Sequence, residues 1–428
     1  MRFPAYRTIL LFIMLVFAIG PLLSQVIGIS GIVLDSVSGK ALPFAQLSLQ
    51  SCAIGTVTNE EGSFTLEVPS LFSKDTLLVA YMGFETRKCP VMALSGNENI
   101  IRLRPGLLQL SEVEIVAYTP EEVIRRMVAA IPANYGPDSL ILTAFVRSQK
   151  FVGGRLAEFT EAIIEDLKTG YKPYGRSDEK EKSRQSNVPL LLKGRVISDT
   201  GMVNSFGDLG RSAGCLGCNF VHDFAEFYYH TVLDEKQFRY YTFKMDEQSA
   251  PGGGKIYHIR FDQKKGVKET LWKGDIYING ADFALLKISQ KPSFEAFDQF
   301  EKDKYKRQFT IRNTPGWYQE MPMMEWTTTY SKRGDSYFLS TIRIENWLTF
   351  KHPSLNQVVK FSHRNEVVVT DASRDPQKTR NFKGDKSTGV NQRWDQVVGK
   401  GDEQFWKGYN YLPIEEKLQE NLKKLGGR

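Results

Sequence analysis

Histidine is scarce in this sequence, with five residues among 428. A zinc peptidase needs two histidines and a carboxylate on one Zn²⁺ ion, with an acid/base glutamate nearby. No H-E-x-x-H motif occurs, and the single H-x-x-E motif, His363 to Glu366, lies in the strand-like segment KFSHRNEVVVT with no histidine after it. The alternation of a strand explains this motif better than a metal ligand set does. We therefore expect no metal site.

The sequence also lacks a complete set of groups for nucleophilic or acid/base catalysis. Gly210 to Gly214 fit the G-x-S-x-G pattern, but a nucleophile elbow follows a buried strand, and the preceding VNSFGDL is a poor one. A flexible loop is the better interpretation. Glu158, Glu161 and Glu165 are candidates for the acid/base pair of an enzyme acting on envelope glycans or peptides. Their spacing more naturally places them on the solvent side of a strand, so we expect no catalytic residue and no cofactor.

Beyond the N-terminus there is no second hydrophobic run long enough to span a membrane. Residues 1–24 have the features of a secretory signal peptide, since Arg2 and Arg7 precede the apolar run Ile9–Leu23 and Ser24 suits a cleavage site. A membrane anchor is the alternative, but the run is shorter than the roughly 20 apolar residues that span a bilayer. No cysteine directly follows the run to carry a lipid. We expect an exported protein of the periplasm, outer membrane or cell surface, peripheral to the outer membrane at most.

A strong excess of charge of one sign is absent. The formal net charge is +7, and removal of Arg2 and Arg7 with the signal peptide lowers it to +5. Basic residues are matched by nearby acidic ones, as in Ser177–Arg184, which we interpret as a solvated loop. This pattern and the expected export both argue against a nucleic-acid partner.

Cysteine is limited to four residues, all in a chain expected to enter an oxidising compartment. An even count permits three pairings of Cys52, Cys89, Cys215 and Cys218. The local arrangement, Cys52 with Cys89 and Cys215 with Cys218, is the simplest. A redox couple, a metal site and free thiols are alternatives for the GCLGC pair, although zinc or haem would need other spacing. We favour disulfides as the interpretation.

The first hundred residues do contain a regular alternation of apolar and polar residues, interrupted by turn residues. Asp35 to Gly39, Asn59 to Gly62, and Gly83 mark the turns. This pattern predicts a small antiparallel β-sandwich. The expected strands cover residues 27–34, 43–50, 54–58, 63–68, 75–82, 84–90 and 99–104.

Three motifs in this region resemble the carboxypeptidase-like regulatory domain, a transthyretin-like sandwich common on envelope proteins of Gram-negative bacteria. They are G-x-V-x-D with G-x-x-L-P-F-A-x-x-x-L, then G-T-V-T-N-E-E-G-x-F-x-L, then D-T-L-x-V-x-Y-M-G-F. The residues that carry the match are Gly31, Asp35, Leu42, Pro43, Phe44, Ala45, Gly55, Thr58, Gly62, Phe64, Tyr81, Gly83 and Phe84. The resemblance implies a surface for binding or spacing that brings no catalytic group of its own.

A linker and a helix follow the sandwich. Thr119 is a good N-cap, Pro120 suits the first helical position, and two glutamates occupy the first turn. An apolar stripe runs from Val123 to Ile131, and Pro132 is expected to end the helix.

Beyond Tyr135 the sequence is rich in strand patterns joined by hairpin-like connections. Expected strands cover residues 139–149, 156–167, 236–245, 255–263, 269–279, 282–290, 322–331, 336–348 and 356–370, and a helix is expected at 219–232. Successive hairpins with long strands predict one large curved antiparallel sheet. The fold class is therefore mainly β, with a few helices.

Further segments resemble a family of two-domain envelope proteins. They are IPANY, AFVRS, GDIYINGADFALLKI and the late DEQFWKGYNYLPIEEKL. In that family a regulatory-type sandwich precedes a β-rich domain similar to the half-barrel of lipoprotein-carrier proteins. The resemblance implies a two-domain architecture and no established activity. We divide the chain into a signal peptide at 1–24, a sandwich domain at 25–104, a linker at 105–135, a half-barrel-like domain at 136–371 and a polar tail with a C-terminal helix at 372–428.

Aromatic residues are plentiful in the long strands and form 12% of the chain. Trp272, Trp326, Tyr330 and Trp347 are candidates to face a ligand, because a curved aromatic face can stack a sugar or hold an acyl chain. Core packing is the alternative for these side chains. The aromatics of the late FWKGYNYL segment are expected to pack on the main body.

These observations predict a non-catalytic binding or accessory protein of the cell envelope. The sandwich would be a docking module, and the curved sheet would hold an apolar ligand, a glycan or a partner segment. An envelope hydrolase and a structural spacer in an outer-membrane receptor assembly are the alternatives.

Overall fold

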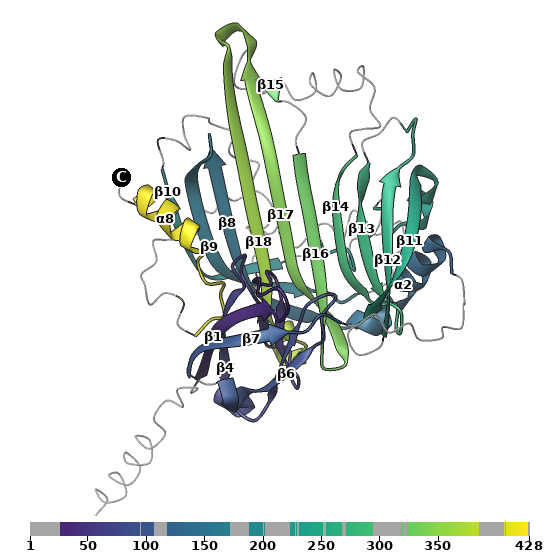
Figure 1. Cartoon of the computed structure of the whole chain (residues 1–428), viewed down its shortest axis with the longest axis vertical. Coiled ribbons are helices and arrows are strands. Elements are labelled where there is room, and N and C mark those ends of the chain that lie inside the picture. Colours follow the sequence, from purple (N-terminus) through teal and green to yellow (C-terminus); the bar gives the residue numbers. More distant parts are fainter. Residues whose placement is uncertain are drawn as a thin grey trace, which may run out of the picture.

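Seven short strands form the N-terminal part of the computed structural model (Figure 1). The structure describes residues 26–94, 96–106, 118–171, 188–199, 201, 223–226, 228, 231–250, 254–267, 271–293, 318–319, 323–384, 406 and 408–426. The expected signal peptide, the loop Ser177–Arg184, the G-x-S-x-G motif, Cys215 and Cys218 lie outside these residues.

Two small sheets form the expected sandwich. Their strands are β1 (Val26–Asp35), β2 (Gln46–Leu49), β3 (Gly55–Val57), β4 (Ser63–Pro69), β5 (Thr76–Ala80), β6 (Arg87–Pro90) and β7 (Gly96–Leu103). The orders are β4-β1-β7 and β3-β2-β5-β6, and all pairs are antiparallel except β1 with β7. Alternate residues such as Ile29, Leu66 and Val79 fill the space between the sheets. Gly62, with φ +75°, makes the turn before β4, and a Cβ there would lie 2.9 Å from the Val33 carbonyl oxygen.

The helix α2 (Pro120–Tyr135) begins as expected, with the Thr119 hydroxyl accepting a hydrogen bond from the Glu122 N–H. The prediction that Pro132 ends it is wrong. The helix continues to Tyr135, which is buried and donates a 2.6 Å hydrogen bond to the Leu285 carbonyl. This anchor and the buried apolar stripe outweigh the one backbone hydrogen bond that proline removes. Gly136, at φ +78°, ends the helix instead.

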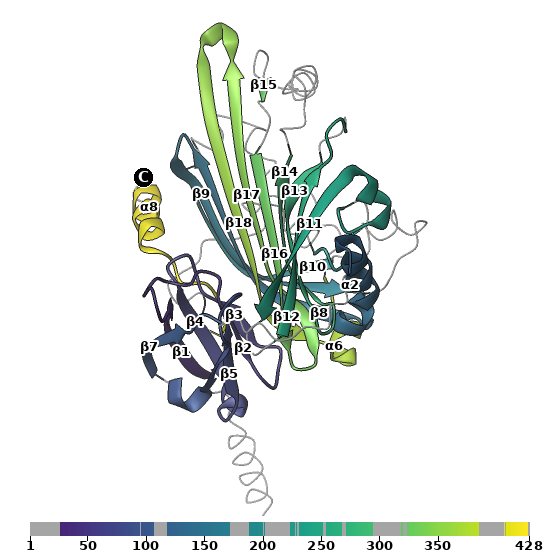
Figure 2. The same cartoon turned by 45° about the vertical axis from the view of Figure 1, so that its right-hand side comes forward.

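The large sheet is confirmed, and ten of its strands form one antiparallel row. In spatial order they are β10 (Val188–Ser198), β9 (Arg155–Lys168), β8 (Leu140–Val152), β18 (Gln357–Ser373), β17 (Ser336–His352), β16 (Met323–Arg333), β14 (Leu285–Pro292), β13 (Trp272–Asn279), β12 (Gly254–Gln263) and β11 (Tyr241–Ala250). The two-residue β15 (Tyr318–Gln319) pairs with β17. The β17–β18 hairpin extends beyond its neighbours (Figure 2).

Two expectations for this part were wrong. Strand β10 was not predicted. It lies at the edge of the sheet, where Pro189 is tolerated because no further strand lies beyond it to need a backbone N–H donor. The described residues of the expected helix at 219–232 form turns instead, closed by hydrogen bonds from Glu226 N–H to the Asp223 carbonyl and from Thr231 N–H to the Tyr228 carbonyl. A 3₁₀ helix, η6 (Glu235–Tyr240), then leads into β11.

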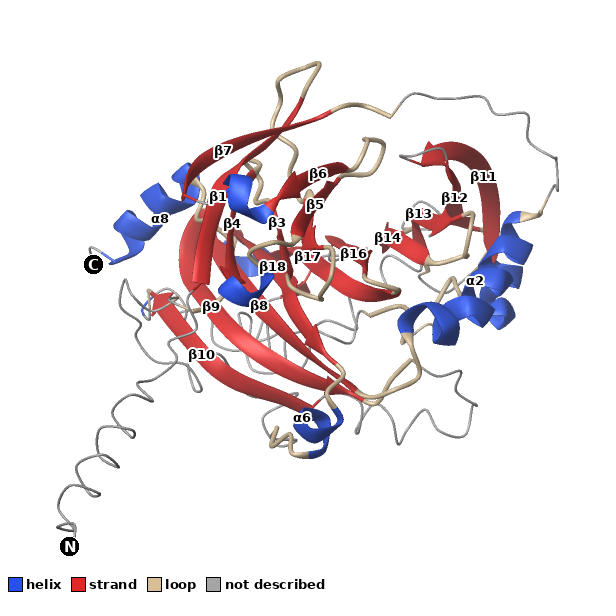
Figure 3. Ribbon diagram, turned by 90° about the horizontal axis from the view of Figure 1, so that it is seen from below, coloured by secondary structure: helices blue, strands red, loops and turns tan. Residues whose placement is uncertain are grey.

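The two faces of the large sheet are covered by different elements. Helix α2 covers one face, where it packs on buried residues such as Ile259, Ile276 and Ile288. On the opposite face Val57 of the sandwich meets Val368 of β18 in a smaller cluster, whose other members are Phe145, Ile163, Trp406 and Leu412. Figure 3 shows the sandwich strands beside the middle of the large sheet and α2 near β11–β13.

The C-terminal segment runs between the sandwich and the sheet, as expected for its aromatics. Trp406 packs edge-on against Phe145, and the short helix α6 (Pro376–Arg380) precedes it in the chain. Helix α8 (Glu416–Gly426) then packs Leu418 and Leu425 on β9. Within the described residues, no helix combines the length and the apolar character needed to cross a membrane.

Candidate functional site

One line of cross-strand neighbours runs over all ten strands and is mostly charged. From β11 to β10 its members are Lys244, Arg260, Asp275, Ser289, Thr327, Arg343, Glu366, Arg147, Glu161 and Arg195. Their sequence neighbours Ile259, Ile276 and Val146 lie in the core under α2. Because successive side chains in a strand point to opposite faces, this line lies on the face away from α2. We call it the polar ladder.

The β8–β10 end of the polar ladder is a buried charge network. Arg147 is fully buried, and its Nε and Nη2 donate to Glu161 Oε1 at 3.0 and 2.8 Å. Arg195 donates to Glu161 Oε2 at 2.9 and 2.6 Å. Arg147 also donates to the carbonyls of Leu412 and Pro413. The network therefore holds the C-terminal segment against the sheet.

The middle of the polar ladder is where the sandwich attaches. Glu60, before β4, forms ion pairs with Arg343 and Arg364 at 2.5 and 2.8 Å. The Arg343 guanidinium also lies over the Phe44 ring, 4.6 Å from its centroid. Gln46 of β2 donates to the Tyr330 carbonyl. These contacts fix the sandwich over β16–β18.

A cleft of about 680 Å³ remains between the sandwich and the sheet. We call it the interdomain cleft. Its floor is the cross-strand row next to the polar ladder, and its roof comes from the loops beside β2 and β5. The floor residues are Tyr277, Lys287, Thr329, Thr341 and Val368, and the roof includes Phe44, Tyr81 and Met82. An apolar lining with a few polar groups and this volume are typical of small-molecule sites.

Most charges around the interdomain cleft have partners. Arg343 lies within 4 Å of carboxylate oxygens of Glu60, Glu345 and Glu366. Lys332 lies 3.8 Å from an Asp282 oxygen. The cleft wall is therefore close to neutral on the β16–β18 side.

Lys287 is different. It is half-buried, and no ion pair or hydrogen bond of its ammonium group is present within the described part of the chain. Its Nζ lies 5.5 Å from the centroid of the Tyr277 ring. Burial lowers the pKa of Lys287, and the nearby Asp275 only partly opposes that effect. Asp275 itself is bound to His258, 2.7 Å away.

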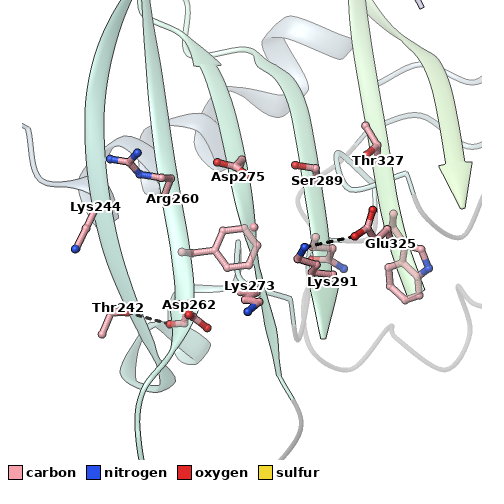
Figure 4. Close-up of a pocket in the computed structure, with 14 residues that line it drawn as sticks. Thr242, Lys244, Arg260, Asp262, Lys273, Asp275, Ser289, Lys291, Glu325 and Thr327 are labelled. Carbon is pink, nitrogen blue, oxygen red and sulfur yellow. Dashed lines mark hydrogen bonds and ion pairs between the residues drawn. The ribbon is translucent and has the colours of Figure 1, made fainter. Parts of the chain in front are cut away.

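The β11–β14 end of the polar ladder is open and lines a second groove of about 770 Å³. Figure 4 shows Lys244, Arg260 and Asp275 projecting from the same side of the strands, with further charged residues beside them. Lys291 and Glu325 pair across β14 and β16 at 3.4 Å, and both side chains are about half exposed. The groove is polar and mixed in charge.

The four predicted ligand-facing aromatics do not form one face, although two of them are in contact. Trp272 and Trp326 pack on each other, 4.5 Å between ring centroids, against the core under α2. Tyr330 is buried there and donates to Asp223. Trp347 lies on the ladder side and is 41% exposed. The alternation of β16 and β17 separates these rings between the two faces, and their role in ligand binding stays a prediction.

Cys52 and Cys89 are free thiols in the structure, so the expected bond between them is not formed. Cys89 is buried on β6, and β5 separates β6 from β2, which the Cys52 loop follows. Neighbouring strands lie about 4.8 Å apart, so this spacing disfavours a disulfide. The Cys52 loop is held instead by fully buried Arg333, which donates to the Ala53 carbonyl at 2.6 Å.

The candidate acid/base glutamates do not form a pair, and the expectation that they face solvent was wrong for two of them. Glu161 is neutralised by two arginines. Glu158 is buried on the other face of β9 and pairs with Lys150 at 2.7 Å. Glu165 is half-buried, and burial raises its pKa. The long side chains of Arg147, Arg195 and Lys150 reach across from neighbouring strands, so Glu161 and Glu158 are buried in ion pairs instead of facing solvent.

The H-x-x-E motif does not assemble a metal site. Glu366 belongs to the polar ladder, whereas His363 lies on the opposite face of β18 and its Nε2 is 2.9 Å from Ser148 Oγ. Burial lowers the pKa of His363 to about 3. Among the residues that the structure describes, no group of three or more histidine, cysteine, aspartate or glutamate side chains could hold a metal ion.

A second buried charge cluster escaped the sequence analysis. Lys168 Nζ lies 2.8 Å from Asp223 Oδ2 and 2.5 Å from Glu226 Oε2. The hydroxyls of Tyr171 and Tyr330 both donate to Asp223 at 2.8 Å. Lys168 pairs with both carboxylates, and Asp223 also accepts the two tyrosine hydrogen bonds, so the cluster anchors the turn at 223–226 to the sheet.

The polar floor of the interdomain cleft was also missed. Of the residues that line the cleft, the sequence analysis had singled out Tyr330 as a candidate aromatic and Pro43, Phe44, Tyr81 and Gly83 in the regulatory-domain motifs. The alternation of Lys287 with Leu286 and Ile288 indicates that its side chain leaves the core. It does not indicate which element covers that side of the sheet.

Comparison with solved structures gives only distant matches. A Vibrio parahaemolyticus domain described as an outer membrane lipoprotein-sorting protein shares 10% identity over 59% of this chain and 91% of its own, with a TM-score of 0.25. A DUF1329 family protein from Desulfovibrio piger shares 9% over 60% and 92%, with a TM-score of 0.26. A LolA superfamily protein from Nitrosomonas europaea shares 9% over 59% and 94%, with a TM-score of 0.19. These scores are too low to carry an argument.

The sandwich has a clearer relative. No curated protein matches the sequence significantly. Residues 29–115 match the family model of the CarboxypepD_reg-like domain, and this range contains β2–β7 and most of β1. The resemblance drawn from the turn and strand motifs is thereby confirmed, and the N-terminal part of this chain is similar in sequence to the CarboxypepD_reg-like domain family.

Proposed function

We propose that this protein is a non-catalytic binding or accessory protein of the cell envelope, in which the sandwich closes a ligand site against the large sheet. The observation that carries the proposal is the interdomain cleft. Its walls come from both parts of the chain, so a ligand there would contact the docking module and the sheet together. The signal-like N-terminus and the regulatory-type sandwich support an envelope location.

The lining of the cleft favours a small, mainly apolar ligand. Phe44, Met82 and Val368 supply apolar surface, and the hydroxyls of Thr329 and Thr341 lie 2.7 Å apart on the floor. The removal of apolar ligand surface from water would provide most of the binding free energy. Arg343 and Lys332 are engaged in ion pairs at the cleft wall.

A neutral fluorescent probe tests this proposal. N-phenyl-1-naphthylamine should bind the full chain with enhanced fluorescence. Met82→Trp places a larger side chain in the cleft and should weaken binding about tenfold or more, a loss of about 1.4 kcal/mol. Met92→Trp is the matched control, because Met92 is 59% exposed elsewhere on the sandwich. Absence of probe binding, or equal loss in both variants, would contradict the proposal.

A further inference from the structure

We infer that the interdomain cleft selects an amphiphile with a single anionic head group, which Lys287 binds. This inference rests on the proposed function and adds the chemical class of the ligand. The head group is a carboxylate or a phosphate, and the tail is apolar.

The first step of the argument is the position of Lys287 on the cleft floor. Its cross-strand neighbours are Tyr277 on β13 and Thr329 on β16. All three residues line the cleft. Lys287 therefore shares the floor with the Thr329–Thr341 hydroxyl pair. One of these hydroxyls donates to the other, and the second keeps a proton that can be donated to an oxygen of a head group.

The second step is the charge balance. Each of the other two cations that line the cleft, Arg343 and Lys332, has a carboxylate of its own. Asp275, the carboxylate whose charge acts on the pKa of Lys287, is bound to His258. Lys287 is thus the cation of the cleft without a carboxylate partner among the described residues.

The third step is energetic. A cation that is partly removed from water is costly unless an anion or hydrogen-bond acceptor compensates it. The face of the Tyr277 ring offers only a weak cation–π contact at 5.5 Å. An anionic head group would complete the pair in a partly desolvated site, where charge-assisted hydrogen bonds are stronger than neutral ones.

The fourth step is the rest of the ligand. The apolar side chains Phe44, Met82 and Val368 share the cleft with Lys287. A simple inorganic anion would leave this surface in contact with water, and a neutral hydrocarbon would leave the ammonium unpaired. An amphiphile satisfies both parts of the lining.

Four probes of equal chain length separate head-group charge from apolar binding. Dodecanoate, dodecyl phosphate, dodecanol and dodecylamine are compared by displacement of the neutral fluorescent probe, below their critical micelle concentrations. Dodecanoate or dodecyl phosphate should bind at least tenfold more tightly than dodecanol, and dodecylamine should bind most weakly. The two anionic arms distinguish a carboxylate site from a phosphate site.

Two lysine variants identify the residue responsible. Lys287→Met should reduce the preference for the anion over dodecanol to within about twofold while dodecanol still binds, and Lys287→Arg should retain the preference. Lys332→Met is the matched control, because Lys332 lines the same cleft with Asp282 as its partner. Retention of dodecanol binding by Lys287→Met also shows that the variant is folded.

The outcomes separate this inference from the proposed function. If none of the four probes binds, the proposed function itself fails. If dodecanol binds as tightly as both anions, the cleft is a ligand site and the inference about Lys287 is overturned. Equal loss of preference in Lys287→Met and Lys332→Met would also overturn it, because the effect would then be one of net charge.

Discussion

The two ends of the polar ladder share one cross-strand line but have opposite surroundings. At the β8–β10 end, Arg147 and Glu161 are fully buried under the C-terminal segment, and each charge has a partner. At the β11–β14 end, Lys291 and Glu325 are about half exposed along an open groove. The same alternation of strand residues therefore produces a structural clamp in one place and a solvent-facing surface in the other.

This difference indicates what decides the role of a charged strand residue. Burial removes the competition from water, so a paired charge becomes essential to stability. Exposure leaves the pair screened and weak. The interdomain cleft lies between the two ends, and Lys287 is only half-buried there, which makes it available to a ligand.

The largest expected effect comes from breaking the buried end. Glu161→Gln removes the carboxylate that Arg147 and Arg195 share and leaves buried Arg147 with only the longer 3.4 Å contact to Glu415. Unfolding in urea should show a loss of about 3–5 kcal/mol of stability. Glu325→Gln is the same change at the open end and should cost at most about 1 kcal/mol. Similar losses for the two variants would contradict the contrast between the ends.

A smaller effect should appear on the opposite face of β18, where His363 is buried without a charge partner. Its pKa is lowered from 6.5 to about 3. The unfolded chain therefore takes up a proton below pH 6.5 that the folded protein does not, so stability should fall as the pH is lowered from about 6.5 toward 3. The slope from this group approaches about 1.4 kcal/mol per pH unit.

His363→Gln tests this pH dependence. Urea unfolding at pH 7, 5.5 and 4.5 should show a shallower loss of stability on acidification than the unmodified chain shows. His352→Gln, at the end of β17, is the matched control and should keep the original slope. An unchanged slope in His363→Gln would show that other groups dominate acid unfolding.

The smallest effect is expected at the border between the two ends, where the sandwich attaches. Glu60→Gln removes one partner from Arg343, which keeps Glu345 and Glu366. Because the Glu60 side chain is 37% exposed, the stability change should be at most about 1 kcal/mol. Calorimetry measures this stability change. A loss as large as that of Glu161→Gln would show that the Glu60 ion pairs behave like the buried charges of the β8–β10 end.

The strands of the sandwich could be predicted because each is specified locally. Short runs such as Ser63–Pro69 alternate strictly, and turn residues such as Gly62 punctuate them. The start of α2 is equally local, since its cap, first proline and apolar stripe all lie within one segment. Edge strand β10 and the turns at 223–226 depend on distant partners and were missed.

The candidate site could not be predicted in the same way. Aromatic content suggested Trp272, Trp326, Tyr330 and Trp347, but three of these rings face the core side and one faces the other side. The cleft instead combines Met82 with Lys287, more than two hundred positions apart in sequence. Periodicity in the sequence indicates that a side chain points away from the core, but it does not show which other part of the chain covers that face of the sheet.

The sequence by itself determined most of the strands, the helix start and the alternation that places charged residues on one face of the large sheet, because these depend on neighbours a few positions away. Only the tertiary structure decided which of those charges are buried, since the C-terminal segment and the sandwich reach them from distant parts of the chain. The free energy of a charged side chain depends on its access to water, and that access is set by packing between segments that are far apart in the sequence.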